Sequence, residues 1–133
     1  MIHELTVKTN RREELIDITS HIQKLVSESE IPDGIVTCFV PHTTAAITIN
    51  ENADPDVRRD IIYKLGKEIP QHDSYHHAEG NSDAHLKSSL IGPSLQILFD
   101  KNRLVLGRWQ GILFCEFDGP RTRRLIVKVI GLA

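Results

Sequence analysis

The chain has 133 residues, the length of one domain, and is long enough to bury a core without disulfide or metal cross-links. Its formal net charge is -2 and its aromatic content is 5%, which argues against a nucleic-acid-binding protein. The N-terminal segment lacks the apolar core of a signal peptide, and no apolar run approaches membrane-spanning length. We therefore expect a single cytoplasmic domain, residues 1–133, without a nucleic-acid or membrane partner.

The first third of the chain predicts a strand followed by a helix. Residues 2–9 (IHELTVKT) alternate apolar and polar side chains, which is typical of a strand with one buried face. Apolar residues at helical spacing then predict an amphipathic helix over residues 12–27. These residues are Leu15, Ile18, Ile22, Leu25 and Val26. The IPDG sequence at 31–34 is a turn signal that ends the helix.

The middle third predicts two strands and two helices. The runs IVTCFV (35–40) and AAITIN (45–50) are rich in β-forming residues. Asp54 can cap a helix that begins at Pro55. Its buried stripe would be Val57, Ile61, Ile62 and Leu65. After a histidine-rich segment, Ser82 or Asp83 can cap a short helix over residues 84–91, which Gly92 and Pro93 end.

The last third predicts only strands. The four segments are SLQILF (94–99), RLVLG (103–107), QGILFCEF (110–117) and RRLIVKVI (123–130). The DKN and DGPRT links between them are short enough for antiparallel hairpins. Because strands and helices are segregated, the pattern predicts an α+β fold with largely antiparallel sheets. Cys38 and Cys115 each lie in an apolar run, so we expect buried free thiols.

The segment YHHAEGNSDAH at residues 75–85 concentrates groups that bind metals or transfer protons. Two imidazoles and a carboxylate, from His76, His85 and Glu79, are ligand types that a catalytic zinc uses. The spacing of His76 and His85 matches no local metal-binding motif such as HExxH. Metal binding would therefore need a further ligand from a distant element, and His42 is the candidate. The three imidazoles could instead hold a phosphate or act as general acid and base. The alternative is a solvated loop.

His42 lies where one predicted strand ends and the next begins, a place where sites are commonly built. Thr43 and Thr44 follow it and could donate hydrogen bonds to an anion, although Thr-Thr is also common in strands. As a loop residue, His42 could equally bond to nearby backbone. Asn50 and Glu51 end the next strand, where the following helix points its free amides and favours an anion.

Two further motifs offer binding groups. Trp109 lies between two glycines and beside Gln110. It could form the wall of a pocket for a flat ring, with Gln110 supplying a hydrogen bond, or it could be a partly buried core residue. EFDGPRTRR at 116–124 combines two carboxylates with arginines such as Arg121. Arginine suits phosphate, but an ion-pair network with these carboxylates is the alternative.

Four blocks taken together resemble the YjbQ family, also labelled UPF0047. The blocks are HTTAAITINENADPDV (42–57), H-x-x-EGNSDAHLKSS (76–89), LGRWQG (106–111) and EFDGPR (116–121). They occur in the family's order. The resemblance implies two packed antiparallel sheets with two main helices and one short helix, in a subunit of a homotrimer. The family's histidine pattern falls on His42, His76 and His85, with His77 as the alternative to His76.

The resemblance also implies an activity, that of a secondary thiamine-phosphate synthase. Such an enzyme joins a pyrimidine-methyl diphosphate to a thiazole phosphate, and pyrophosphate leaves. The implied catalytic residues are His42, His76, His85 and Glu79, and the three histidines are also the implied metal ligands. The implied substrate-binding residues are Thr43, Thr44, Asn50, Glu51, Arg108, Trp109, Gln110 and Arg121. Arg108 replaces the threonine of the family's usual GTWQ, so no role of that hydroxyl transfers.

We expect a divalent metal, Zn²⁺ or Mg²⁺, as the only cofactor, with Asn50, Glu51 and Glu79 as groups that orient the site or bind Mg²⁺. Two other functions fit the same residues. One is a zinc-dependent hydrolase or lyase, in which Glu79 is the base for a metal-bound water. The other is a protein that binds a phosphorylated small molecule without turnover.

Overall fold

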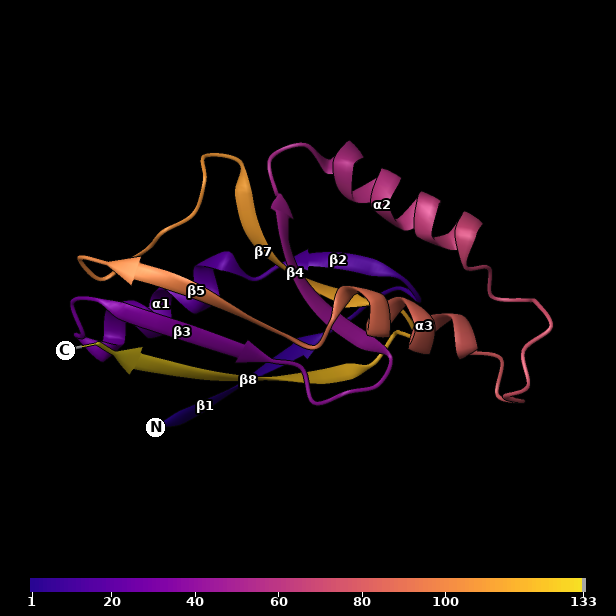
Figure 1. The fold of residues 1–133 in the computed structure, drawn as a ribbon, viewed down its shortest axis with the longest axis horizontal. Helices are drawn as coiled ribbons and strands as arrows, with labels where there is room; N and C mark the ends of the chain where they lie inside the picture. The colour runs from indigo at the N-terminus through magenta and orange to yellow at the C-terminus, as the bar shows by residue number, and fades with distance from the viewer. Residues whose placement is uncertain (133) are drawn as a thin grey trace.

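The computed structural model describes residues 1–132, which form an α+β fold of two antiparallel sheets and three helices (Figure 1). The strands are β1 (Ile2–Lys8), β2 (Glu14–Asp17), β3 (Gly34–Phe39), β4 (Ala45–Glu51), β5 (Ser94–Asp100), β6 (Arg103–Leu104), β7 (Gln110–Glu116) and β8 (Thr122–Gly131). The helices are α1 (Thr19–Ser29), α2 (Pro55–Glu68) and α3 (Ser82–Ile91). The sheet orders are β1-β8-β3-β5-β6 and β2-β7-β4. The predicted α+β fold class is confirmed.

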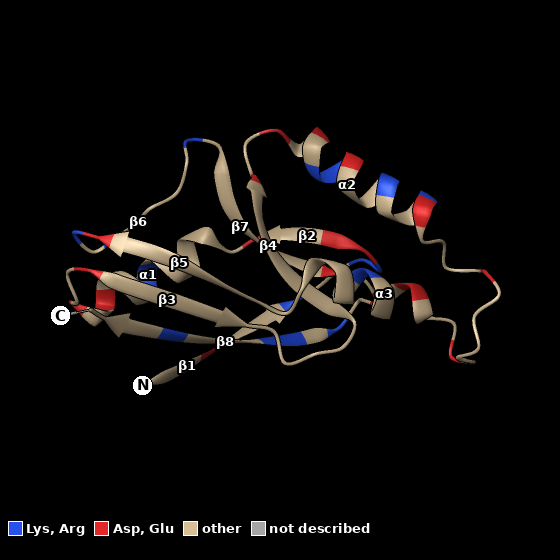
Figure 2. Cartoon of the chain, in the orientation of Figure 1, with Lys and Arg blue, Asp and Glu red and all other residues tan. Residues whose placement is uncertain are grey.

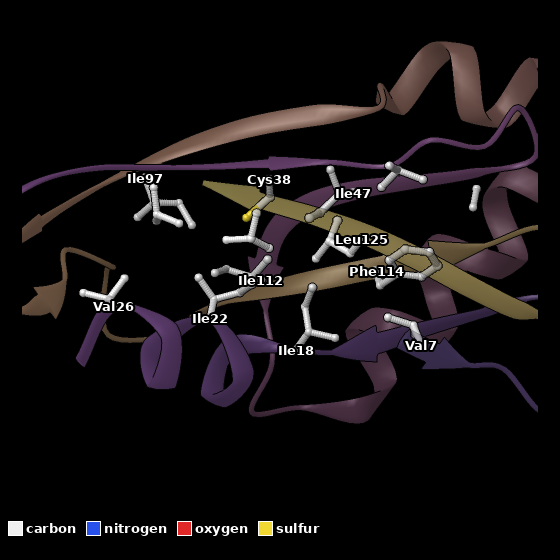
Figure 3. Packing of buried hydrophobic residues seen from close by; sticks show 14 of the residues in the cluster. Val7, Ile18, Ile22, Val26, Cys38, Ile47, Ile97, Ile112, Phe114 and Leu125 are labelled. Carbon is white, nitrogen blue, oxygen red and sulfur yellow. The ribbon is translucent and has the colours of Figure 1, made fainter. Parts of the chain in front are cut away.

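The three-stranded sheet separates two hydrophobic cores, as the side chains of β7 illustrate. Ile112 and Phe114 enter the core that this sheet shares with the five-stranded sheet and α1 (Figure 3). Leu113 and Cys115 enter the second core, with Ala84 of α3. The alternation arises because successive side chains of a strand project to opposite faces. The molecule is therefore layered, with α2 and α3 on the outer face of the three-stranded sheet.

Residues 12–27 form a strand and then a helix, so the prediction of one continuous helix is wrong. Leu15 lies in β2, which pairs with β7, and its side chain is buried in the second core. The helix proper begins at Thr19, and its buried side chains are Ile22 and Val26. The spacing of Leu15 fits a strand and a helix equally well. Pairing with β7, a strand almost 100 residues away, decides between them.

The two predicted hairpins have different outcomes. The DKN link does join an antiparallel pair, β5 and β6, although β6 is shorter than the predicted strand over 103–107. The DGPRT link does not form a hairpin, because β7 and β8 belong to different sheets. Its Gly119 has no space for a side chain, since a Cβ there would overlap the backbone of Arg11 and the side chains of Thr9 and Glu116. The link therefore carries the chain tightly from one sheet to the other.

The start of α2 agrees with the sequence prediction, and the start of α3 differs from it. α2 begins at Pro55, and the Asp54 carboxylate accepts a hydrogen bond from the N–H of Asp56 at 2.9 Å, as predicted. α3 begins at Ser82, two residues before the predicted start, and its N-cap residue Asn81 makes no side-chain cap bond. Asp83 does not cap α3. Its carboxylate forms buried ion pairs instead.

The two cysteines and the absence of a membrane-spanning segment were also predicted. Cys38 and Cys115 are free and fully buried, as predicted. Burial raises the pKa of each thiol to about 12, so neither is ionised at neutral pH. Among the residues that the structure describes, no helix has both the length and the apolar character needed to cross a membrane.

Candidate functional site

A polar pocket of about 430 Å³ lies where the β3–β4 link, the start of α3 and the β7–β8 link meet. Its volume is in the range of small-molecule sites, roughly 300–1,000 Å³. The residues around it are Pro41, His42, Thr43, Thr44, Glu79, Asn81, His85, Asp118, Arg121 and Arg123. Among these, Pro41 alone is apolar. The fold thus brings together six of the predicted site residues, namely His42, Thr43, Thr44, Glu79, His85 and Arg121.

The inner wall of this pocket, which we call the histidine pocket, is a buried ion pair between Arg123 and Glu116. Nε of Arg123 donates to both carboxylate oxygens of Glu116, at 2.9 and 3.1 Å. Nη2 of Arg123 also donates to Oγ1 of Thr44 at 2.8 Å, and the Thr9 hydroxyl donates to Glu116 at 2.7 Å. Because both charges are paired and hydrogen-bonded, they can be buried without a large net cost. The network holds Thr44 rigidly at the pocket.

His42 is held in one protonation state by the strand beside it. Its Nε2 accepts a hydrogen bond from the backbone N–H of Arg124 at 2.9 Å. In the neutral ring the proton must then be on Nδ1. Burial lowers the pKa of His42, and the positive charges of Arg123 and Arg124 lower it further. His42 is therefore a neutral imidazole near pH 7, with Nδ1 as the nitrogen available to a ligand.

The loop between α2 and α3 places His77, rather than His76, against the pocket histidine His85. The two rings are 5.5 Å apart between centroids and meet edge to face. Nε2 of His77 also lies 3.7 Å from a carboxylate oxygen of Glu79, a pocket residue. His76 is exposed and is not among the residues that line the pocket. His77 is also exposed and does not line the pocket, so its contacts with His85 and Glu79 favour it while the choice between His76 and His77 stays a prediction.

The first turn of α3, which carries Asn81 and His85 to the pocket, is anchored by a buried ionic cluster that the sequence analysis missed. Nζ of Lys87 donates to Asp83 at 2.9 Å and to Glu13 at 3.1 Å, and Nη2 of Arg12 donates to Asp83 at 2.9 Å. Asp83 and Lys87 are almost completely inaccessible. The i, i+4 spacing of Asp83 and Lys87 was a signal for this pair. Nothing local in the sequence indicated that Arg12 and Glu13 complete it.

Burial opposes the ionised form of Asp83 and would raise its pKa. Hydrogen bonds from Arg12 and Lys87, together with their charges, outweigh burial and hold the pKa of Asp83 below its ordinary value. Nearby, Nδ2 of Asn81 donates to Asp118 at 2.9 Å, while its Oδ1 is buried without a hydrogen-bond partner among the described residues. The side chain of Asn81 is thus held beside the pocket by its bond to Asp118.

The predicted three-histidine metal centre does not assemble in one chain. Within residues 1–132, no group of three His, Cys, Asp or Glu side chains has an arrangement that could hold a metal ion. His42 has already committed Nε2 to Arg124, and His76 is away from the pocket. The donor set of a single chain thus does not fit a resident metal as it stands.

The remaining predicted residues lie at the other end of the three-stranded sheet. In the β4–β7 pair, Ala45 is opposite Glu116 beside the histidine pocket, whereas Glu51 is opposite Gln110. Six residue steps of about 3.3 Å put the two ends about 20 Å apart. Trp109 and Glu51 line a separate shallow hollow there, and Asn50 contributes to a groove beside α2. The indole does not wall the histidine pocket of its own chain.

Trp109 is neither a core residue nor loosely placed. It is 54% exposed, and the guanidinium of Arg108 lies 4.8 Å from its ring centroid. The Gln110 side chain accepts a hydrogen bond from the N–H of Gly107 at 2.7 Å, which closes the turn that carries the indole. Gln110 is thus used to shape this turn. We call residues 51–55 and 107–110 the tryptophan end.

Comparison with known proteins agrees with the resemblance of the motifs. Residues 3–132 match the family described as UPF0047 protein YjbQ-like. The chain is 56% identical over 131 residues to the UPF0047 protein MJ1081 of Methanocaldococcus jannaschii, covering 98% of this chain and 95% of that relative. It is 48% identical over 132 residues to the UPF0047 protein YugU of Bacillus subtilis, covering 98% of this chain and 100% of YugU.

Solved structures give the same result. The crystal structure of an uncharacterized conserved protein of the YjbQ/UPF0047 family from Clostridium acetobutylicum superposes with a TM-score of 0.95. It is 54% identical and the match covers 96% of this chain and 99% of that one. A YbjQ-like protein of unknown function from Sulfolobus solfataricus has a TM-score of 0.94 at 34% identity, covering 99% and 97% of the two chains. On these grounds, the chain belongs to the UPF0047 family of YjbQ-like proteins.

Proposed function

We propose that the histidine pocket binds a phosphorylated small molecule and that the protein is a transferase of the thiamine-phosphate synthase type. The observation that carries this proposal is the gathering of two imidazoles, two guanidinium groups and two hydroxyls around one pocket of about 430 Å³. These groups, from His42, His85, Arg121, Arg123 and the two threonines, are of types suited to phosphate oxygens. Both arginines also pair within the chain, Arg123 with Glu116 and Arg121 with Asp118, so a phosphate would share them with these carboxylates. The carboxylates in the pocket, Glu79 and Asp118, leave it mixed in charge, which suits a ligand that also has hydrogen-bond donors.

The proposed reaction depends mainly on stabilisation of the charge that develops on the leaving pyrophosphate, and it needs no covalent intermediate with the protein. The C–O bond between the pyrimidine methylene carbon and the diphosphate breaks, and pyrophosphate leaves with the electron pair. A C–N bond forms between that carbon and the thiazole nitrogen. Fixed donors aimed at the departing oxygens lower the barrier because they need no reorganisation. Nδ1–H of His42 and the guanidinium of Arg121 are the groups we assign to this role.

Further groups around the pocket suit a phosphorylated ligand. Thr43 is exposed at the rim of the pocket, where its hydroxyl can follow a phosphate. Glu79 and His85, which lie on either side of the start of α3, can then exchange a proton with the ligand.

The test is direct synthesis. Purified protein is incubated with the pyrimidine-methyl diphosphate and the thiazole phosphate, and thiamine phosphate and pyrophosphate are quantified together. We expect equal amounts of both products. His85→Ala should lower the rate roughly 10²–10⁴-fold, the range for loss of an acid–base group. Folded wild-type protein that releases neither product would refute the transferase assignment.

The zinc-dependent hydrolase or lyase is a rival that the residue types favour but the geometry of one chain does not. Elemental analysis of protein purified without chelators separates the two. Stoichiometric zinc in the wild type, lost in His85→Ala, would favour the rival over the transferase. Binding without turnover is the other rival. It predicts that pyrophosphate raises the melting temperature while no candidate substrate is consumed.

We also propose that the protein is a homotrimer. No helix within residues 1–132 covers the outer face of the five-stranded sheet (Figure 1), which presents Phe39 and Leu98, 44% and 59% exposed. Ile35 lies opposite both Leu98 and Ile130 in the register, so apolar side chains run across three strands. The next row of the same face is polar, with Thr37 opposite Gln96 and Lys128. Exposed apolar side chains interspersed with polar ones occur at surfaces that meet another subunit. Mass measurement in solution by light scattering tests the trimer.

A further inference from the structure

The histidine pocket lacks a surface on which a flat ring could lie. Pro41 is the one apolar residue among those that line it in the described chain, and the other residues around it carry charge or hydrogen-bonding groups. Ligand sites for ring compounds are usually lined in large part by apolar and aromatic side chains. The pocket of a single chain is therefore equipped for the phosphate portion of a ligand and incomplete for its ring.

The tryptophan end has the complementary composition. It presents a half-exposed indole in a shaped turn, beside Ala53 and Pro55, in a hollow that has few polar groups. Trp109 is the only tryptophan of the chain. Within one chain, the β4–β7 register separates the indole from the histidine pocket by about 20 Å. A contact between the two ends therefore requires two chains.

Both ends carry exposed charges of both signs. Beside the histidine pocket, Arg121 pairs with Asp118 and Arg124 pairs with Glu4. At the tryptophan end, Glu51 ends β4, Asp54 lies on the link to α2, and Arg108 lies beside the indole. Figure 2 shows acidic ribbon where β4 passes into that link. A second copy can therefore pair charges at either end, and the composition of the two ends, rather than net charge, distinguishes them.

The uncovered face of the five-stranded sheet continues up to the histidine pocket. Phe39 is only three residues before His42, and Ile126, its partner in the register, is two residues after Arg124. A neighbouring chain that covers the exposed Phe39 thus reaches the rim of the pocket. Phe39 and the charged rim adjoin, and a second copy can contact both.

We propose that a second copy of this chain places its tryptophan end over the histidine pocket, so that each site is completed by Trp109 of a neighbour. The phosphate part of the ligand lies among His42, His85 and Arg121 of one chain, and the ring lies against the indole of the next. A head-to-tail contact repeats until a ring closes, and a trimer is one such ring. This inference deepens the proposed function, since it rests on the pocket being a ligand site.

The first test is chemical cross-linking, which does not depend on ligand binding. Thr43→Cys puts a thiol at the pocket rim, and Arg108→Cys puts one at the tryptophan end. The native thiols are buried with pKa values of about 12, so a maleimide will not modify them in the folded protein. The reagent is a bis-maleimide too short to span the two ends of one chain. The variant that carries both substitutions should give covalently linked chains on a denaturing gel.

The two single substitutions are the matched controls, and each should leave the chains unlinked. Linked chains in either single variant at the level of the double variant would mean that like ends meet, which overturns the proposal. An unlinked double variant whose melting temperature matches the wild type would overturn it as well.

The second test reads the indole directly. Pyrophosphate is titrated into the assembled protein while Trp109 emission and the heat of binding are recorded in parallel. We expect the emission to shift at the same pyrophosphate concentrations at which heat is released, and the shift to be lost in Arg121→Met. Release of heat without a change in emission would show that the pocket binds the anion but that the neighbour's indole is not part of the site. If no heat is released, the proposal that the pocket binds an anion is wrong. The cross-linking result then decides by itself whether the two ends meet.

Discussion

Nε2 of His42 accepts a hydrogen bond from the backbone N–H of Arg124, so the pocket histidine is tied to a strand of the five-stranded sheet. The bond exists only while that nitrogen is unprotonated. Protonation of His42 would turn an acceptor into a donor that faces another donor. The ionisation of one imidazole is therefore coupled to the attachment of the β3–β4 link to β8.

This coupling predicts a pH-dependent stability. The ordinary pKa of histidine is about 6.5, and that of folded His42 is lower, so the unfolded chain binds more protons between the two values. The stabilisation from neutral His42 is complete above the unfolded value and declines as the pH falls toward the folded value. Melting temperatures measured at falling pH should drop more steeply in the wild type than in His42→Gln. Equal slopes would contradict the coupling.

The buried pair of Arg123 and Glu116 should dominate the stability of the pocket wall. Arg123→Met leaves the Glu116 carboxylate buried and unpaired, which costs about 3–5 kcal/mol. The adjacent Arg124→Met removes only an exposed pair with Glu4 and should cost about 0–1 kcal/mol. Urea denaturation of both variants measures the two free energies of unfolding. Similar losses in the two variants would show that burial of the Arg123 pair is unimportant.

Lys87 should act as the anchor of α3. Lys87→Met removes one cation from the cluster that binds Asp83 and Glu13, and we expect a loss of about 3–5 kcal/mol. Lys64→Met, which breaks the exposed pair with Glu68, is the control and should leave the free energy of unfolding almost unchanged, because solvent screens this pair. The amides of α3 should also exchange with deuterium faster in Lys87→Met. Unchanged exchange in α3 would argue that the cluster does not hold the helix.

His76 and His77 provide a matched pair of substitutions. His77→Ala removes the ring that packs on His85 and approaches Glu79. We expect it to weaken pyrophosphate binding roughly tenfold, the effect of losing one charge-assisted contact or its support. His76→Ala should leave binding unchanged, because the contacts with His85 and Glu79 come from the His77 ring. Calorimetry on the two variants measures both, and the reverse order would favour the original assignment to His76.

Local patterns predicted the fold well wherever local physics decides it. Asp54 and Pro55 specify the start of α2, and the alternation in β1 and β8 specifies their faces. The errors arise where distant segments decide. Leu15 joins a strand because β7 lies beside it, and the DGPRT link crosses between sheets because β8 pairs with β1 and β3.

The candidate site shows the same division. The motif order suggested that His42, Glu79 and His85 would meet, and the fold places them around one pocket. The choice between His76 and His77 depends on one residue in a loop without periodicity, which the sequence cannot resolve. The separation of Trp109 from the pocket follows from strand register, because the two motifs occupy opposite ends of β4 and β7. Register depends on how strands pair across the sheet, so it cannot be predicted from the sequence of either strand alone.

The two cysteines offer native reporters of how the layers come apart. Cys38 lies in the core between the sheets, and Cys115 lies in the core beneath α2 and α3. A thiol reagent can reach each only when the layer above it opens. Comparing the alkylation rates of the two sulfurs would reveal whether the helices peel away before the sandwich separates or whether the whole subunit opens in a single step.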